Sequence, residues 1–383
     1  MGKLLKIVLS IFAAVTLTII IAAIVLPFLI DPNDFKPEIE SVAKKYTGRH
    51  ISIEGDLELS VFPWLGLSTG KISLSNATGF GDASFAVIEE SNIKVKLIPL
   101  LSKKVEVNRI VLKGLSLNLE KNKHGTTNWD DLIHQKDKKQ ESVKQPATET
   151  PAAEKDQSES LPVIAALAIG GISIENAHIL WNDRQAGKQV ELKAFNLKTD
   201  SLAFDEPIGI DLSVTMLSKK PEISEKILFN TDFFLNKELD NFSLKDMKLE
   251  TVTFGDNIPG GEIKSRLSAE IALDLTKQLL KITGLQARVG NLDLSADLKG
   301  KNILDNPIVE GPVKISEFKL REFLEQLGVT VPAMQDSKAL NSLSVQLNLT
   351  ATQNSAGIKN LIVMLDDTQL KGSVEINYFV KRA

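Results

Sequence analysis

Only a few residues in this sequence are candidates for chemistry. The chain has four histidines, and none is spaced as HxH or HxxxH, so no pair is placed to bind one metal ion from a strand or a helix. They are His50, His124, His134 and His178. The sequence contains neither a GxGxxG dinucleotide pattern nor a Walker-type GxxxxGK[ST] pattern. These observations predict no bound cofactor and no metal.

Two acidic doublets are the remaining candidates for acid–base work. They are Asp130 with Asp131, and Asp366 with Asp367. Neighbouring residues on a strand point to opposite faces, so a doublet is a poor general acid–base pair. We interpret both doublets as turn or sheet-edge residues and expect the protein not to be an enzyme.

The composition narrows the class of protein further. The chain of 383 residues has no Cys, which excludes a disulfide scaffold, a thiol catalyst and a zinc–cysteine site. The net charge is only −4, so no overall field favours nucleic acid, and we expect no nucleic-acid partner. Aromatic residues make up 5%, too few for the stacking platforms that single-stranded nucleic acids need.

An uncharged, mostly apolar run occupies residues 7–30, with Lys3 and Lys6 before it and Asp31 and Asp34 after it. A helix of this length reaches roughly 36 Å, enough to cross a hydrocarbon core of about 30 Å. We predict a membrane anchor at 1–30 with a cytoplasmic N-terminus and the body on the far side. Its anchor residues are Ile7, Leu9, Ile11, Phe12, Leu17, Ile20, Ile24 and Leu26. A cleaved signal peptide is the alternative; its apolar core would be shorter and would end in small residues.

A short amphipathic helix is predicted at 34–47. Phe35, Ile39, Val42 and Tyr46 fall on one side of a 3.6-residue period, and Gly48 ends the helix. This helix could lie at the membrane surface or cover the start of a sheet. Its polar side is mixed in charge, which favours the second.

From His50 onward the apolar period changes to two, which predicts strands with one apolar and one wet face. Such alternation is typical of antiparallel sheets. The predicted fold is mostly β, with an elongated, curved antiparallel sheet after the anchor and few short helices. The clearest alternating apolar residues are Ile93, Val95, Leu97, Leu115, Leu117, Leu119, Leu292, Leu294, Val345, Leu347 and Leu349.

The pattern collapses at 134–160, a stretch rich in Lys, Glu, Gln, Ser and Pro with almost no large apolar residue. Such a segment cannot bury enough surface to offset its ordering entropy, so we predict a disordered linker. It separates a first β region, 31–133 with its leading helix, from a second, 161–383.

Alternation leaves two architectures open. A closed sandwich would bury the apolar faces internally, whereas an open curved sheet would leave an apolar groove. In a membrane-tethered protein, acyl chains would be the natural occupant of such a groove, at about 0.8 kcal/mol per buried CH₂. The alternating residues given above are therefore candidates for lining a lipid groove.

Several segments together resemble one known family. They are residues 46–67 after the anchor, 74–82, 97–101, 112–119 (LKGLSLNL), 125–132 (GTTNWDDL) and 365–372 (LDDTQLKG). Their order and spacing are similar to those of the AsmA family of Gram-negative envelope proteins. The resemblance implies an inner-membrane anchor, a periplasmic β body, and kinship with TamB-like and chorein-type bridge proteins whose curved sheets carry lipid. It also implies a role in outer-membrane biogenesis and in phospholipid or lipopolysaccharide homeostasis.

Family members usually continue beyond the 365–372 stretch, so the resemblance implies that this chain is truncated relative to them. The expected partners are membrane lipids, either phospholipid or lipopolysaccharide, the inner membrane, and outer-membrane assembly proteins. The alternative function is a scaffold or assembly factor for outer-membrane proteins that carries no lipid.

Overall fold

The computed structural model describes residues 31–60, 64–96, 99, 106–133, 168–256, 258, 260–331, 334–336 and 339–377. The predicted anchor, the predicted linker at 134–160 and Leu97 lie outside these residues, so those predictions stay predictions. Within the described part, no helix is both long and apolar enough to cross a membrane. The chain divides into two units, Met1–Lys188 and Gln189–Ala383, called unit 1 and unit 2 below.

The described residues are mostly β, as predicted, and their helices are short. Unit 1 begins with η1 (Pro32–Phe35) and α2 (Lys36–Thr47), and unit 2 contains α5 (Leu320–Gln326). Gly48 ends α2 at φ 72°, a left-handed position that favours glycine, so the predicted end of this helix is confirmed.

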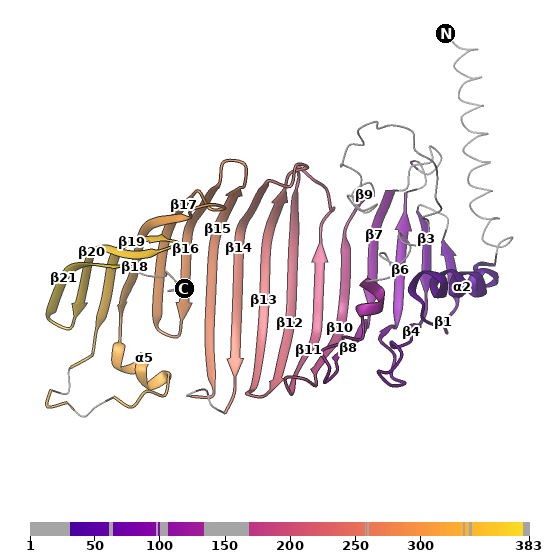
Figure 1. Cartoon of the computed structure of the whole chain (residues 1–383), viewed down its shortest axis with the longest axis horizontal. Helices are drawn as coiled ribbons and strands as arrows, with labels where there is room; N and C mark the ends of the chain where they lie inside the picture. The colour runs from indigo at the N-terminus through magenta and orange to yellow at the C-terminus, as the bar shows by residue number, and fades with distance from the viewer. Residues whose placement is uncertain are drawn as a thin grey trace, which may run out of the picture. The chain divides into compact units, whose positions relative to one another are not determined.

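Unit 1 is a sheet of short strands (Figure 1). They are β1 (Ile51–Ile53), β2 (Leu57–Ser60), β3 (Leu65–Thr69), β4 (Ile72–Leu74), β5 (Ala86–Ile88), β6 (Glu90–Val95), β7 (Glu106–Lys113), β8 (Ser116–Lys121), β9 (Ala168–Ile169) and β10 (Ile172–Asp183). Consecutive pairs act as the halves of longer, broken strands: β7 and β8 pair with successive parts of β10. The halves β5 and β6 likewise pair with β8 and β7.

Glycines allow these breaks. A Cβ on Gly55 would lie 2.5 Å from the Cα of Gly70, so the break between β1 and β2 can approach the break between β3 and β4 only without side chains. Gly114 separates β7 from β8 at φ 60°. The repeated kink therefore has a backbone cause in the sequence.

One part of the fold prediction is wrong for unit 1, where the sheet is not purely antiparallel. Strand β10 runs parallel to β7 and β8, and β9 runs parallel to β7. Parallel neighbours need a long crossover, and residues 122–167 provide that length of chain. The alternation of apolar and polar residues could not predict the parallel pairing, because it shows which face a residue is on and not the direction of the adjacent strand.

Unit 2 is an antiparallel meander in which each strand pairs with the next (Figure 1). The strands are β11 (Lys188–Thr199), β12 (Pro207–Lys219), β13 (Glu222–Leu235), β14 (Asn241–Phe254), β15 (Glu262–Asp274), β16 (Leu279–Val289), β17 (Leu292–Lys301), β18 (Ile308–Phe318), β19 (Leu343–Thr352), β20 (Ser355–Leu365) and β21 (Thr368–Asn377). Apart from neighbouring strands, the described elements of unit 2 make few contacts with one another. This unit is thus an open sheet, not a closed sandwich.

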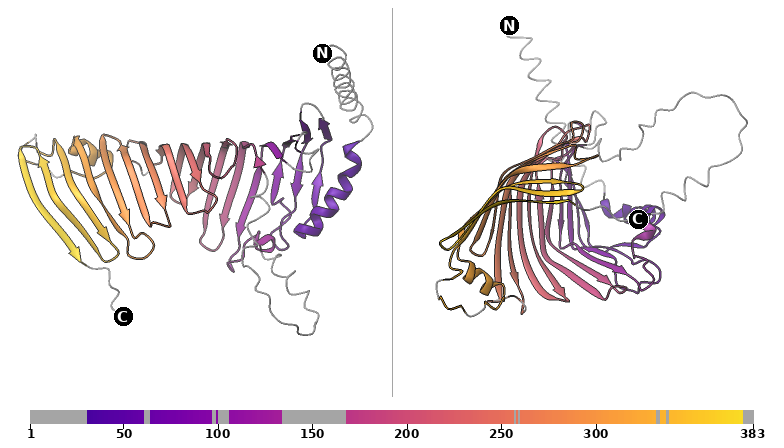
Figure 2. Two further views of the ribbon diagram at one scale, coloured as in Figure 1. Left: turned by 90° about the horizontal axis from the view of Figure 1, so that it is seen from above. Right: turned by 60° about the vertical axis from the view of Figure 1, so that its left-hand side comes forward.

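The strands of unit 2 curve along their length (Figure 2), and β-bulges near their middles give the cause. Register shifts occur beside Ala194, Asp246, Gly284 and Asn360, each at a φ between 47° and 60°. A bulge adds one residue to one strand and bends it. These four residues are exposed, which places the added length on the outer side of the bend.

Candidate functional site

One side of unit 2 carries a continuous apolar row. Residues paired directly across a sheet point to the same face. Directly paired residues can be followed from strand to strand without a break from β11 to β21. The row is Leu197, Leu212, Phe229, Leu249, Leu267, Ala287, Leu294, Ile315, Val345, Val363 and Leu370, and we call it the apolar row. Not one polar side chain interrupts it.

The next row, one residue along each strand, faces the other way and is polar. It consists of Lys198, Asp211, Asn230, Lys248, Ser268, Gln286, Ser295, Lys314, Gln346, Ile362 and Lys371. Ile362 is its one apolar member. The polar row shows that the opposite face of the sheet is polar on every strand of the unit except β20.

Bulges keep the apolar face continuous along the strands as well. Leu244 and Met247 are an odd number of positions apart on β14, yet they pair with Ile271 and Ala269, two residues apart on β15. Two residues on one strand that differ by two positions share a face. The added residue, Asp246, therefore shifts the alternation so that apolar side chains stay on one side.

The apolar face is the inner side of the bend. Four of its buried residues lie at the bulges: Val214, Met247, Ala269 and Ala296 are 8%, 7%, 6% and 6% exposed. No second layer of described residues covers them, so their burial comes from neighbours on the same face that converge where the strands bend. Elsewhere on this face the apolar row is half-buried, apart from Leu370 on β21, which is 60% exposed.

Five of the residues predicted to line a lipid groove belong to this face. Leu294 and Val345 are members of the apolar row, and Leu292, Leu347 and Leu349 lie an even number of positions from them on β17 and β19. The other members of the row were missed, although a change of parity in the alternation, as in Leu280, Ile282, Leu285 and Ala287, marks such strands.

The remaining groove candidates lie in unit 1. Ile93 pairs with Leu67 and Ile110. Val95 pairs with Leu65 and Val107. Leu117 pairs with Ala86 and Ile179, and Leu119 with Trp181. Leu115 lies at the break after Gly114, where its carbonyl accepts a hydrogen bond from the His178 N–H at 2.7 Å. Apolar residues thus meet across strands in this unit too.

Two depressions of unit 2 are open to solvent. One of about 1010 Å³ is at the strand ends, between Lys219, Phe254 and Ile258. Another of about 590 Å³ is lined by Lys248, Arg266 and Arg288 of the polar face. Its lining also includes four members of the apolar row, Leu249, Leu267, Ala287 and Leu294. Because no second layer of described residues covers it, the apolar face is an open surface.

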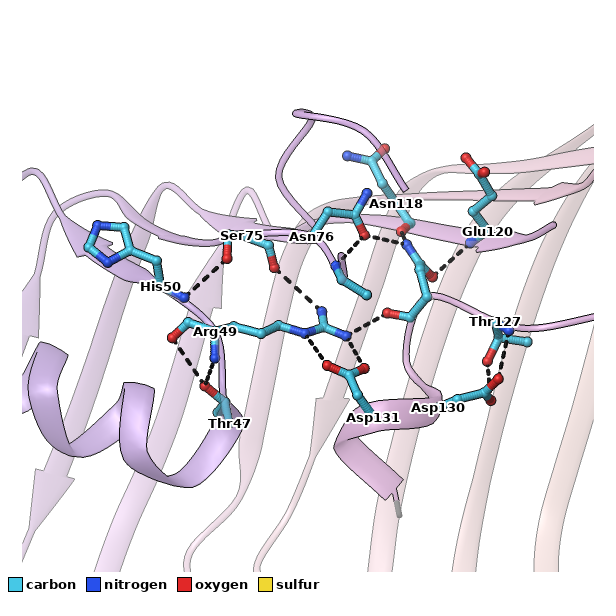
Figure 3. Close-up of polar contacts among 12 residues, drawn as sticks. Thr47, Arg49, His50, Ser75, Asn76, Asn118, Glu120, Thr127, Asp130 and Asp131 are labelled. Carbon is cyan, nitrogen blue, oxygen red and sulfur yellow. Dashed lines mark hydrogen bonds and ion pairs between the residues drawn. The ribbon is translucent and has the colours of Figure 1, made fainter. Parts of the chain in front are cut away.

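In unit 1 a buried arginine, Arg49, pairs with a partly exposed carboxylate, Asp131 (Figure 3). The Arg49 side chain is 3% exposed and donates from Nε and Nη2 to both oxygens of Asp131. It also donates to the Asn128 carbonyl at 2.6 Å and lies over the Phe85 ring, 4.6 Å from its centroid. The hydrogen bonds from Arg49 hold the pKa of Asp131 below its ordinary value. Together, these contacts join the end of α2 to the turn after β8.

The doublet of Asp366 and Asp367 lies in a turn, as predicted, whereas Asp131 of the other doublet pairs with the buried Arg49. Asp130 accepts hydrogen bonds from the Thr127 amide and hydroxyl, as in a turn. Asp366, in the β20–β21 turn, accepts three backbone N–H bonds from Leu340, Asn341 and Ser342. These bonds lower the pKa of Asp366. The spacing of residues in the sequence could not predict these hydrogen bonds, because they join residues far apart in the chain.

Chemistry-bearing residues do not gather elsewhere in the described part of the chain. No group of three or more His, Asp or Glu residues there is placed to hold a metal ion. Residues 66–70 (GLSTG) fit the GxSxG pattern, but Ser68 lies within β3 and accepts a hydrogen bond from Asn92 at 2.6 Å. A nucleophile elbow needs a turn from strand to helix, so this pattern is structural.

Comparison with known proteins found two sequence matches. The sequence profile of the AsmA family matches residues 1–378. Protein AsmA of Escherichia coli (strain K12) is 31% identical over 108 residues, which cover 27% of this chain and 17% of that relative. The matched part is thus a small share of the relative's length. No solved structure matches the chain.

Proposed function

The chain belongs to the AsmA family, and from this premise we propose that it supports outer-membrane biogenesis by sheltering lipid acyl chains on the apolar face of unit 2. The continuous apolar row is the observation that carries the proposal. An uncovered apolar surface of this extent is costly in water, and such surfaces mark sites for partners. An acyl chain lying across the strands would contact row members in succession.

Curvature supports an acyl chain as the occupant. The inner side of the bend lets apolar side chains contact a narrow ligand from more than one direction, and each buried CH₂ contributes about 0.8 kcal/mol. A lipid headgroup can remain in water at the edge of the sheet. The mechanism is passive binding and release, so it needs no catalytic residue and no cofactor.

The proposed location follows from residues 7–30. They anchor the chain once in the inner membrane with the N-terminus in the cytoplasm, and the β units lie in the periplasm. The proposed partners are phospholipid or lipopolysaccharide, together with outer-membrane assembly proteins that receive or direct the lipid. Family membership supports the link to outer-membrane biogenesis.

Adjacent residues on opposite faces give a matched test. Leu294→Asp places a carboxylate in the apolar row, and Ser295→Asp places the same group one residue away on the polar face. We expect Leu294→Asp to lose most of the lipid that purifies with the full chain, because an acyl chain that covers the carboxylate would have to remove it from water. Ser295→Asp should keep it. Lipid extraction and mass spectrometry, normalised to folded protein, measure both.

Two outcomes would contradict lipid shelter. One is equal lipid in both variants, and the other is no lipid in the parent chain when it is extracted gently from membranes. The second outcome would favour the alternative, a scaffold for outer-membrane proteins that carries no lipid. A parallel pair, Leu347→Asp and Asn348→Asp on β19, repeats the comparison at a second strand.

A further inference from the structure

Helix α2 packs on unit 1 through its polar side. Glu40 Oε1 accepts a hydrogen bond from the Ile53 N–H at 3.0 Å, which ties the helix to β1. Lys36 Nζ lies 3.7 Å from an Asp56 carboxylate oxygen. Lys36, Glu40, Ala43 and Thr47 are the residues of α2 that are partly covered. None of its residues is fully buried.

The apolar side of the same helix faces away from the sheet. Phe35, Ile39, Val42 and Tyr46 are 50%, 39%, 47% and 66% exposed. At about 100° per residue, these four are centred roughly 100° around the helix from the side that contacts β1. The helix therefore lies at the start of the sheet, as predicted, but hydrogen-bonding side chains hold it there and its apolar side stays exposed.

The sequence limits what can cover this exposed side, which we call the α2 stripe. Residues 31–34 alone separate Ile30, the end of the long apolar run, from Phe35. Such a link spans at most about 17 Å. If residues 7–30 lie in a bilayer, as proposed above, the start of the α2 stripe lies near the surface of the same bilayer.

We propose that α2 lies in the interface of the membrane that holds residues 7–30, with Phe35, Ile39 and Val42 inserted among the lipids. Amphipathic helices bind in this way, with the apolar face at the boundary of headgroups and acyl chains. The helix contains three Lys and two Glu, a net charge of 3 − 2 = +1, so apolar contact and not charge drives insertion. Because α2 is also bonded to β1, this contact fixes the start of unit 1 at the lipid surface.

The absence of Cys from the chain makes a site-specific test direct. The full chain is reconstituted in phosphatidylethanolamine–phosphatidylglycerol vesicles as Val42→Cys or as Ser41→Cys, each carrying an environment-sensitive dye. Val42 lies on the α2 stripe, and Ser41 is an exposed neighbour on another side of the helix. Two quenchers of the dye's fluorescence are compared: a lipid with a spin label near its headgroup, and iodide dissolved in the water.

We expect the dye at residue 42 to be quenched several-fold more by the spin-labelled lipid than the dye at residue 41, with the order reversed for iodide. The difference should persist at high salt, because charge does not drive it. Equal iodide quenching at both positions would overturn the proposal, as would a dye at residue 42 shielded from both quenchers, which would mean that protein covers the stripe. The result is independent of the lipid retained by Leu294→Asp.

Discussion

At the scale of single residues, Arg49 shows how unit 1 holds a charge that water does not reach. Its guanidinium has two bonds to Asp131, one to the Asn128 carbonyl and one to the Ser75 carbonyl at 3.4 Å. The Asn128 side chain is itself fully buried, and its amide oxygen accepts the Glu120 N–H at 2.9 Å. Each polar group of this cluster therefore has a partner, which is the condition for burying it at low cost.

We predict that Asp131→Asn lowers the free energy of unfolding of unit 1 by about 2 kcal/mol at pH 7, because a buried cation loses its charged partner. The pKa of Asp131 is lowered in the folded state, so its contribution is complete above the unfolded value of about 4 and is lost as pH falls through the lower folded value. Denaturant unfolding followed by tryptophan fluorescence measures this, since Trp64, Trp129 and Trp181 all lie in unit 1.

Asp82→Asn is the control, because Asp82 is an exposed carboxylate of the same unit. It should change the unfolding midpoint little at any pH. The gap between the parent chain and Asp131→Asn should close as pH falls below about 4. A gap that stays constant with pH would show that the variant acts through packing and not through the charge.

At the scale of elements, alternation predicted the strands but not their direction or their bends. Leu292, Leu294, Ala296 and Leu298 alternate without interruption, and β17 was found from them. In β16 the apolar residues change from even to odd positions at Gly284, where a bulge shifts the register against both β15 and β17. The parallel β10 and the Arg49–Asp131 contact depend on residues far apart in the chain. Local periodicity carries no information about them.

The bulge at Gly284 gives a prediction for the curvature of the sheet. Gly284 has φ 60°, and a Cβ there would meet no atom, so Gly284→Ala introduces backbone strain and no clash. We expect a loss of about 1 kcal/mol in the free energy of unfolding of unit 2. Gly372→Ala on β21 is the control, because a Cβ there also meets open space and its φ is not left-handed.

Thermal unfolding followed by far-ultraviolet circular dichroism distinguishes the two glycine variants. Gly284→Ala should lower the midpoint, whereas Gly372→Ala should leave it near that of the parent chain. Gly284→Asn should fall between them, because Asn tolerates the left-handed region better than Ala does. Equal midpoints for all the variants would mean that the bulge is not held in this conformation.

At the scale of the whole molecule, the two faces of unit 2 differ in polarity and in what covers them. The polar row keeps one face in water, and the apolar row leaves the other without a covering layer among the described residues. In a closed fold the apolar residues at such positions would be buried by a second sheet or by helices. Here the ten buried hydrophobic residues of the described part include the small side chains Ala269 and Ala296 at the bend. The fold thus depends on sheet hydrogen bonds and on contacts within one face.

This arrangement predicts a native state that binds an apolar fluorescent dye, which well-packed domains do not. The delipidated full chain in mild conditions should enhance the dye's fluorescence while keeping its cooperative unfolding transition, and added phospholipid should displace the dye. Leu267→Asp, in the middle of the apolar row, should reduce dye binding, whereas Ser268→Asp on the polar face should not. If the dye binds only in partly denaturing conditions, the apolar row is covered in solution. Lipid binding could then not be attributed to an exposed apolar face.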